Sequence, residues 1–120
     1  MIKKRINTDL FISLSILENN QPADLSTARD LKVFVYDCDK KVEYTYKTNN
    51  NIITIQYPKL TNTKLGMYGI SVTYYKTSTD SEVGSINYAT DFPCAFMIVL
   101  YSTEEDNPNV KLTSTVINKI

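Results

Sequence analysis

The chain has 120 residues, of which 42% are hydrophobic, and this combination fits one domain with its own core and excludes a wholly disordered protein. The formal net charge is zero, with 13 basic and 13 acidic residues, so the basic surplus that a non-specific nucleic-acid-binding protein needs is missing. Histidine is absent, which removes the side chain most used for proton transfer near neutral pH.

Seven short segments alternate apolar and polar residues or are rich in β-branched and aromatic residues, and each predicts a β-strand. The predicted strands are residues 9–17, 31–37, 42–47, 52–57, 67–76, 83–90 and 92–101. Their apolar faces are the expected core: Leu10, Ile12, Leu14 and Ile16; Leu31, Val33 and Val35; and Tyr68, Ile70, Val72 and Tyr74. Turn-forming residues separate the strands at 19–22, 37–40, 48–51 and 77–81, and residues 23–28 suggest a short helical turn.

Two of these segments are the most informative about architecture. Gly66 stands two residues before Tyr68 at the entry to a strand, where a tyrosine can plug the corner of a β-sandwich and send its hydroxyl to a nearby backbone group. Residues 92–101 are the most apolar run, so we expect a central strand buried on both faces, with Pro93 at its beginning. The sequence therefore predicts an all-β sandwich in which Tyr68 belongs to the core.

The two ends of the chain differ from its middle. We expect an N-terminal arm at residues 1–8, the sandwich at residues 9–106 and a C-terminal β-like arm at residues 107–120. The C-terminal segment either folds back on its own sheet or pairs with a neighbouring subunit, and the sequence leaves both open. The start is basic, but polar residues 7–9 interrupt it, so we expect no export signal and no membrane span, and a soluble protein made in a cytoplasm.

Carboxylates are the first candidates for chemistry, and none forms a convincing site. Asp37 and Asp39 supply too few oxygens for a calcium loop, so we interpret them as residues of a surface turn whose charge Lys40 and Lys41 offset. No pattern pairs the remaining carboxylates as a general acid and base; these are Asp24, Asp30, Asp91 and the cluster at residues 104–106.

Nucleophiles are no more promising. A serine nucleophile usually needs a histidine base, which this chain lacks, and three glycines cannot build a phosphate loop. Cys38 and Cys94 allow one disulfide or none, and we favour free, reduced thiols, with Cys94 inert inside an apolar strand. We therefore predict no catalytic, cofactor-binding or metal-binding residues and no enzymatic activity.

Tyrosine is abundant, with nine copies and no tryptophan, and a tyrosine face can stack on a sugar ring. Tyr44 and Tyr46 share one strand face, and Tyr68 and Tyr74 share another. Tyrosine is also an ordinary strand residue that packs well across strands, and we favour that role. A glycan platform built from Tyr44, Tyr46, Tyr74 or Tyr75 stays as an alternative.

Several short motifs occur in a familiar order. Residues 20–26 read Asn-Gln-Pro-Ala-Asp-Leu-Ser and lead into the strand at 31–36, and later come Ile-Ile-Thr-Ile at 52–55 and Leu-Gly-Met-Tyr-Gly-Ile at 65–70. This order resembles the small immunoglobulin-like β-sandwich at the N-terminus of phage baseplate and tail-fibre proteins, and related virion proteins of phages that infect Bacteroides-type hosts. The resemblance covers residues 9–101 and implies an immunoglobulin-like antiparallel β-sandwich of about seven strands with extended termini.

The resemblance also implies a role. It brings no catalytic residues, and no shaft or receptor-binding tip follows residue 101, which favours an accessory piece. We expect a non-enzymatic virion protein, a capsid auxiliary or decoration protein that binds other virion proteins, with no cofactor, nucleic acid or membrane as partner, and a homo-oligomer is left open. The alternatives are a tail, baseplate or fibre adaptor, a carbohydrate-binding module, and a bacterial cell-surface or pilus-type subunit.

Overall fold

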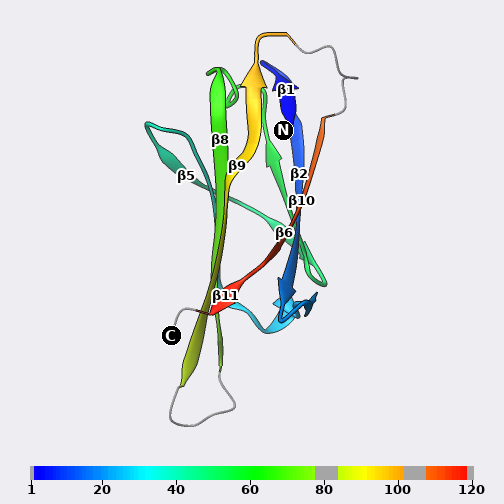
Figure 1. The fold of residues 1–120 in the computed structure, drawn as a ribbon, viewed down its shortest axis with the longest axis vertical. Helices are drawn as coiled ribbons and strands as arrows, with labels where there is room; N and C mark the ends of the chain where they lie inside the picture. The colour runs from blue at the N-terminus through cyan, green and yellow to red at the C-terminus, as the bar shows by residue number, and fades with distance from the viewer. Residues whose placement is uncertain (1, 78–83, 102–107, 119–120) are drawn as a thin grey trace.

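The computed structural model describes residues 2–77, 84–101 and 108–118, and it consists of two β-sheets packed face to face (Figure 1). The elements in chain order are β1 (Lys3–Arg5), β2 (Leu10–Glu18), β3 (Gln21–Pro22), a 3₁₀ turn η1 (Leu25–Thr27), β4 (Arg29–Tyr36), β5 (Lys41–Tyr44), β6 (Lys47–Asn49), β7 (Ile52–Tyr57), β8 (Gly66–Thr77), β9 (Ser85–Val99), β10 (Asn109–Thr115) and β11 (Ile117–Asn118). The predicted all-β sandwich is confirmed.

The two sheets draw their strands from distant parts of the chain. The first sheet has the order β1-β9-β8-β4-β5, with β11 also paired to β9, and the second has the order β10-β2-β7-β6, with β3 paired to β2. Most pairs are antiparallel, but β1 runs parallel to β9 and β10 runs parallel to β2. The expected antiparallel pairing therefore holds for most of the sandwich, and both exceptions are made by the terminal segments.

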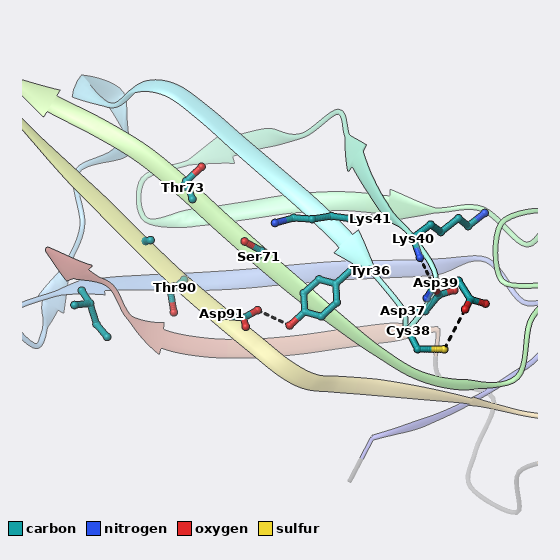
Figure 2. Close-up of a pocket in the computed structure, with 12 residues that line it drawn as sticks. Tyr36, Asp37, Cys38, Asp39, Lys40, Lys41, Ser71, Thr73, Thr90 and Asp91 are labelled. Carbon is teal, nitrogen blue, oxygen red and sulfur yellow. Dashed lines mark hydrogen bonds between the residues drawn. The ribbon is translucent and has the colours of Figure 1, made fainter. Parts of the chain in front are cut away.

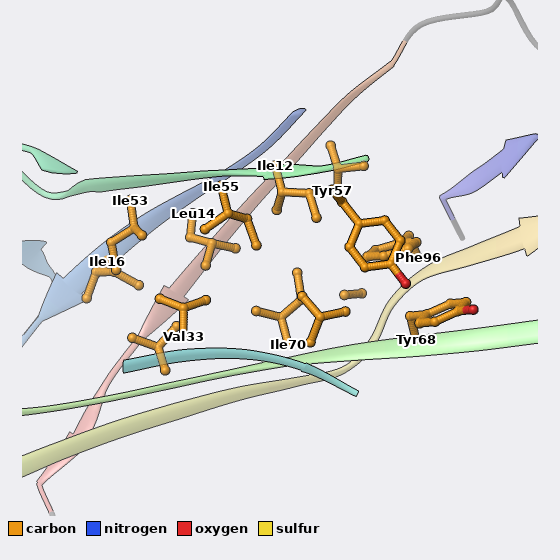
Figure 3. Close-up of a cluster of buried hydrophobic side chains, with 14 of the residues drawn as sticks. Ile12, Leu14, Ile16, Val33, Ile53, Ile55, Tyr57, Tyr68, Ile70 and Phe96 are labelled. Atoms are coloured by element: carbon orange, nitrogen blue, oxygen red, sulfur yellow. The ribbon is translucent and has the colours of Figure 1, made fainter. Parts of the chain in front are cut away.

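The core lies between the sheets, and the alternating patterns predict it well. All eleven residues expected on the apolar faces of β2, β4 and β8 are buried. Side chains from β2 and β7 in one sheet meet those from β4, β8 and β9 in the other (Figure 3). Alternation works here because each sheet has one face toward the core and one toward solvent.

Strand β9 differs from its prediction. Segments 83–90 and 92–101 were expected as two strands, but residues 85–99 form one strand. The register of this strand with β8 shifts between Tyr68 and Ile70, and Pro93 lies in the irregular part of β9 that results. Proline is tolerated there because a bulge does not need its missing N–H group. The expected burial on both faces is also wrong, because Cys94, Leu100 and Tyr101 are exposed.

The strand predicted at residues 42–47 is divided between the sheets. Its first part, β5, belongs to the first sheet, and after residues 45–46 the chain enters β6 in the second sheet. The turn expected at 48–51 follows at once, with Asn50 in the left-handed conformation at φ 56°. Of the predicted turn at 77–81, residues 78–81 lie outside the described residues, as does residue 83 of the strand predicted at 83–90.

The corner tyrosine is confirmed. Tyr68 is buried near the start of β8, its ring stacks on that of Phe96 at a centroid distance of 5.3 Å, and its hydroxyl donates to the carbonyl of Lys64 at 2.8 Å. This is the bond that a tyrosine corner makes to the backbone a few residues upstream.

Removing only the corner hydroxyl, in Tyr68→Phe, is expected to lower the free energy of unfolding by about 1 kcal/mol, because the ring stays and one hydrogen bond is lost. Urea denaturation followed by circular dichroism measures the change. Tyr75→Phe is the matched control, because Tyr75 lies exposed in the same strand, and its change should stay within about 0.5 kcal/mol. Equal effects of the two substitutions would show that the corner bond contributes nothing.

The C-terminal segment forms part of the sandwich. After β10 pairs with β2, the chain crosses to the first sheet, where Ile117 pairs with Ala89 of β9 (Figure 1). Ser114 and Thr90, which both point into the sandwich, are joined by a 2.6 Å hydrogen bond between their hydroxyls. The segment expected as a C-terminal arm thus folds back on both sheets of its own chain over its described residues.

Candidate functional site: a rigid apolar end of the sandwich

The loop between β7 and β8, residues 58–65, is held by the two tyrosines that flank it. The hydroxyl of Tyr57 donates to the carbonyl of Thr61 at 3.3 Å, and that of Tyr68 donates to the carbonyl of Lys64. The amide of Thr61 closes a turn on the carbonyl of Pro58 at 2.8 Å. Both ends of the loop are therefore anchored to core residues.

Asn62 fixes the middle of the same loop to the segment between β1 and β2. It is fully buried, its side-chain oxygen accepts from the amide of Asn7 at 2.8 Å, and its side-chain nitrogen donates to the carbonyl of Thr8. The amide of Lys59 donates to the side chain of Asp9 at 2.7 Å. A buried amide that satisfies two backbone groups specifies a single loop conformation, because any other leaves polar groups unpaired.

This rigid loop presents apolar side chains to solvent. Leu60 is 82% exposed and Leu65 is 50% exposed, and at the same end of the sandwich Leu100 and Tyr101, just after β9, are 72% and 75% exposed. The register that pairs Gly66 with Ile98 places the start of β8 beside the end of β9, so the four side chains share one end of the molecule. We call these four residues the apolar end. Exposed apolar groups on a preorganised loop are typical of protein-binding surfaces, because such a loop loses little conformational entropy when a partner binds.

A second concave feature lies on the outer face of the first sheet. It has a volume of about 760 Å³, with Ser71 and Thr73 of β8 at its base and the β4–β5 turn and Ile117 among its lining residues. Figure 2 shows Tyr36 pointing across it, and its hydroxyl donates to Asp91 at 2.6 Å. The ring covers Gly69, where an added Cβ would come within 2.2 Å of it. No local pattern in the sequence indicates that the ring of Tyr36 needs a glycine in the neighbouring strand.

We expect the stability of the protein at high pH to depend on the ionisation of its buried tyrosines. Burial, helped by the bond to Asp91, raises the pKa of Tyr36 to about 12, and burial also raises the pKa values of Tyr57 and Tyr74. Between about pH 10 and 12 the unfolded chain loses phenol protons that the folded chain keeps. Their contribution to stability is therefore constant below pH 10 and falls above it. Urea midpoints measured at about pH 7, 9, 10.5 and 11.5 check this, and a midpoint that rises above pH 10 would contradict it.

Asp37 and Asp39 behave as turn residues. One side-chain oxygen of Asp37 accepts from the amides of Asp39 and Lys40 at 2.8 and 2.9 Å, and these bonds hold the pKa of Asp37 below its usual value. Asp39 forms an ion pair with Lys64, which lowers the pKa of Asp39. Lys64, from the β7–β8 loop, makes the ion pair, and the expectation that Lys40 and Lys41 offset the charge of this turn holds in part, because the charge of Lys40 also lowers the pKa of Asp37. The Nζ of Lys41 lies over the ring of Phe34 instead, 4.8 Å from its centroid.

The other candidate carboxylates are engaged separately. Asp24 caps η1 by accepting from the amide and the hydroxyl of Ser26 at 3.1 and 2.6 Å. Asp91 accepts from Tyr36, and Asp30 sits at a left-handed position with φ 54°. The cluster at residues 104–106 lies outside the described residues. The structure therefore brings no two of Asp24, Asp30 and Asp91 together by a shared hydrogen bond.

The proposed glycan platform is not assembled. Tyr74 is fully buried, donates to Glu18 at 2.6 Å and stacks on Tyr88. Tyr44 packs on Tyr57 with ring centroids 5.4 Å apart. Tyr46 lines a depression with Phe11 on the second sheet, whereas Tyr75 belongs to the first. The four tyrosines therefore share no surface, because Tyr74 is buried, Tyr44 is half-buried against Tyr57, and the other two lie on different sheets.

The cysteines are both free and exposed. Free thiols were predicted, but the expected burial of Cys94 is wrong, because it lies in the irregular part of β9. Cys38 contacts the side chain of Asp39 at 3.7 Å in the β4–β5 turn. No disulfide joins the two.

Comparisons with known proteins add no family. No protein-family model, no curated protein and no solved structure matches the chain. Over residues 2–77, 84–101 and 108–118, the structure holds no helix that is long and apolar enough to cross a membrane.

Sequence reasoning missed the apolar end. The available signal was the pair of isolated leucines, Leu60 and Leu65, in a loop that is otherwise polar and turn-forming. Nothing local distinguishes Asn62 from its neighbours, because its partners lie about 55 residues away along the chain.

Proposed function

We propose that this chain is a non-enzymatic structural protein of a bacteriophage particle, a capsid auxiliary or decoration protein that binds neighbouring virion proteins. The single observation that carries the proposal is the apolar end, in which a loop fixed by Asn62 and two tyrosines exposes Leu60 and Leu65 beside Leu100 and Tyr101. A surface of this kind fits protein contact and offers no group for chemistry.

The arrangement of strands supports the immunoglobulin-like part of the proposal. Strands β2, β7 and β6 are neighbours as B, E and D are in an immunoglobulin domain, and β9, β8, β4 and β5 are ordered as G, F, C and C′. Tyr68 then lies near the start of strand F, where that fold has its corner tyrosine. Strand β10 takes the place beside strand B. This agrees with the resemblance of the sequence motifs to phage virion domains.

The size of the apolar end favours a repeated assembly. The four side chains, three leucines and one tyrosine that are each at least half exposed, amount to a few hundred Å² of exposed surface. That is in the range of functional surface patches but below the roughly 800 Å² per partner of a stable pairwise complex. Many copies on a symmetric shell supply avidity from contacts that are individually weak.

The proposal is tested on particles. The gene should lie among capsid, portal or tail genes, and mass spectrometry of density-purified virions from that phage should detect the chain in a fixed ratio to the major capsid protein. A chain found only in the soluble fraction of the lysate, with none in the particles, would overturn the proposal. A ratio of a few copies per particle would indicate that the protein belongs to the tail or baseplate and not to the head.

A further inference from the structure

Strand β10 presents a long open edge. Its seven residues pair in unbroken register with Phe11–Leu17 of β2. The amide of Phe11 donates to the carbonyl of Pro108 at 3.0 Å, and the amide of Val116 donates to the carbonyl of Leu17 at 2.9 Å. Because backbone groups alternate along a strand, the even-numbered residues face β2, and Lys111, Thr113 and Thr115 point their N–H and C=O groups away from it.

Nothing in the described part of the chain pairs with that outer side. Strand β10 ends its sheet, and in Figure 1 its first half runs along the border of the molecule before the strand crosses toward β11. The side chains of Lys111, Thr113 and Thr115 are all exposed. The backbone groups of these three residues form a template for one more strand.

The other edges of the two sheets have features that hinder pairing with a further strand. Strands β5, β6 and β1 are four, three and three residues long, which leaves little to pair with. The outer edge of β9 is covered in part by β1 and β11 and is interrupted by the irregularity at Pro93. Short edges, bulges and proline are the devices by which proteins avoid unwanted strand pairing. Strand β10 has neither an internal proline nor a bulge, and Lys111 is its only charged residue.

We infer that the outer edge of β10 accepts an extended strand from a partner protein, and that this strand places an acidic side chain opposite Lys111. Main-chain hydrogen bonds from Lys111, Thr113 and Thr115 supply the attachment, as in other cases of strand addition. Lys111 forms no ion pair within the described residues, so its charge is available to select the partner.

A second copy of the chain that pairs over the full length of β10 fits this edge less well. In an antiparallel pair of β10 strands centred on Leu112, the two Lys111 side chains are diagonal neighbours on one face, and in the adjacent register centred on Lys111 they lie directly opposite. Like charges so placed repel, whereas an opposite charge attracts. The inference concerns a strand-accepting edge and stands whether or not the chain belongs to a virion.

The test uses the whole protein and two synthetic probes. One is a capped seven-residue peptide of alternating threonine and valine with a central glutamate, and the other has lysine in place of that glutamate. In a titration followed by backbone amide NMR, the glutamate peptide should shift the amides of Lys111, Thr113 and Thr115 more than those of Val110, Leu112 and Ser114. It should bind about threefold more tightly than the lysine peptide, and Lys111→Glu should reverse that preference.

Two variants isolate the backbone contact. Thr113→Pro removes one outward N–H group and leaves the ladder to β2 intact, since proline is tolerated on the open side of an edge strand. It should weaken peptide binding at least about fivefold, the loss of one hydrogen bond. Thr113→Ala keeps the N–H group and should bind as the natural chain does.

Three results would overturn the inference. One is the absence of any shift at these amides with millimolar peptide, and another is equal binding by Thr113→Pro and Thr113→Ala. The third is protection of these amides that grows with protein concentration alone, which would make a second copy the occupant. If Thr113→Pro does not fold, Lys111→Glu still decides, because it changes only an exposed side chain. None of these results bears on whether the chain is found in particles.

Discussion

A chain that ends at residue 108 is expected to lose most of its stability. The deletion removes Val110 and Val116, which are 1% and 7% exposed, and the seven-residue ladder between β10 and β2. It also removes the hydrogen bond between Ser114 and Thr90 that joins the two sheets. Two buried valines alone contribute roughly 3–5 kcal/mol, which is comparable to the whole stability of a small domain.

The measurement is urea denaturation of the shortened chain beside the full one, with the folded baseline checked by circular dichroism. Thr113→Ala is the matched control, because it changes an exposed side chain of the same strand and should stay within about 0.5 kcal/mol. A shortened chain with an unchanged midpoint would mean that β10 and β11 are dispensable arms. That outcome would restore the separate C-terminal arm expected from the sequence.

The second large effect is expected at Asn62. Replacing it by alanine leaves the amide of Asn7 and the carbonyl of Thr8 without their partner in a half-buried place, which costs about 1–3 kcal/mol. The β7–β8 loop should also lose its fixed conformation, since its remaining anchors lie at its ends. Urea denaturation measures the first effect, and hydrogen exchange at the amide of Asn7 measures the second.

Thr63→Ala serves as the control for Asn62→Ala, because Thr63 is an exposed neighbour in the same loop. Its stability and the exchange rate at Asn7 should match those of the natural chain. If Asn62→Ala also matched, the buried amide would not be what holds the loop. The preorganisation argument for the apolar end would then fail.

The parts of the fold that depend on local pattern were predictable. The period of two in β2, β4 and β8 predicts which face each strand buries, and the Gly66-x-Tyr68 spacing predicts the tyrosine corner. Each of these signals lies within about ten consecutive residues. They identify an all-β sandwich without any knowledge of how its strands are ordered.

The parts that depend on distant partners were not predictable. Pro93 is accommodated inside β9 because the register with β8 shifts between Tyr68 and Ile70, and the 42–47 segment is divided because its two parts pair in different sheets. Asp39 is neutralised by Lys64, 25 residues further along the chain, although two lysines stand next to it in sequence. Residues 109–118 read as a plausible strand, but nothing in them indicates a parallel pairing with β2.

The apolar end was missed for a related reason. An exposed leucine in a loop is common and by itself indicates nothing. Leu60 gains significance only from the buried bonds of Asn62 and Tyr68, which fix the loop that carries it. Those bonds join residues in three separate parts of the chain.

The most direct test of the proposed role is particle incorporation of a chain carrying Leu60→Ser and Tyr101→Ser. Both side chains are exposed, so the variant should unfold at the same urea concentration as the natural chain. Supplied in trans to a phage that lacks the gene, it should be recovered in purified particles at least about tenfold less than the natural chain, a loss of about 1.4 kcal/mol per contact. Ile117→Ser, an exposed apolar residue away from the apolar end, should be incorporated normally. Equal incorporation of all three chains would contradict the account.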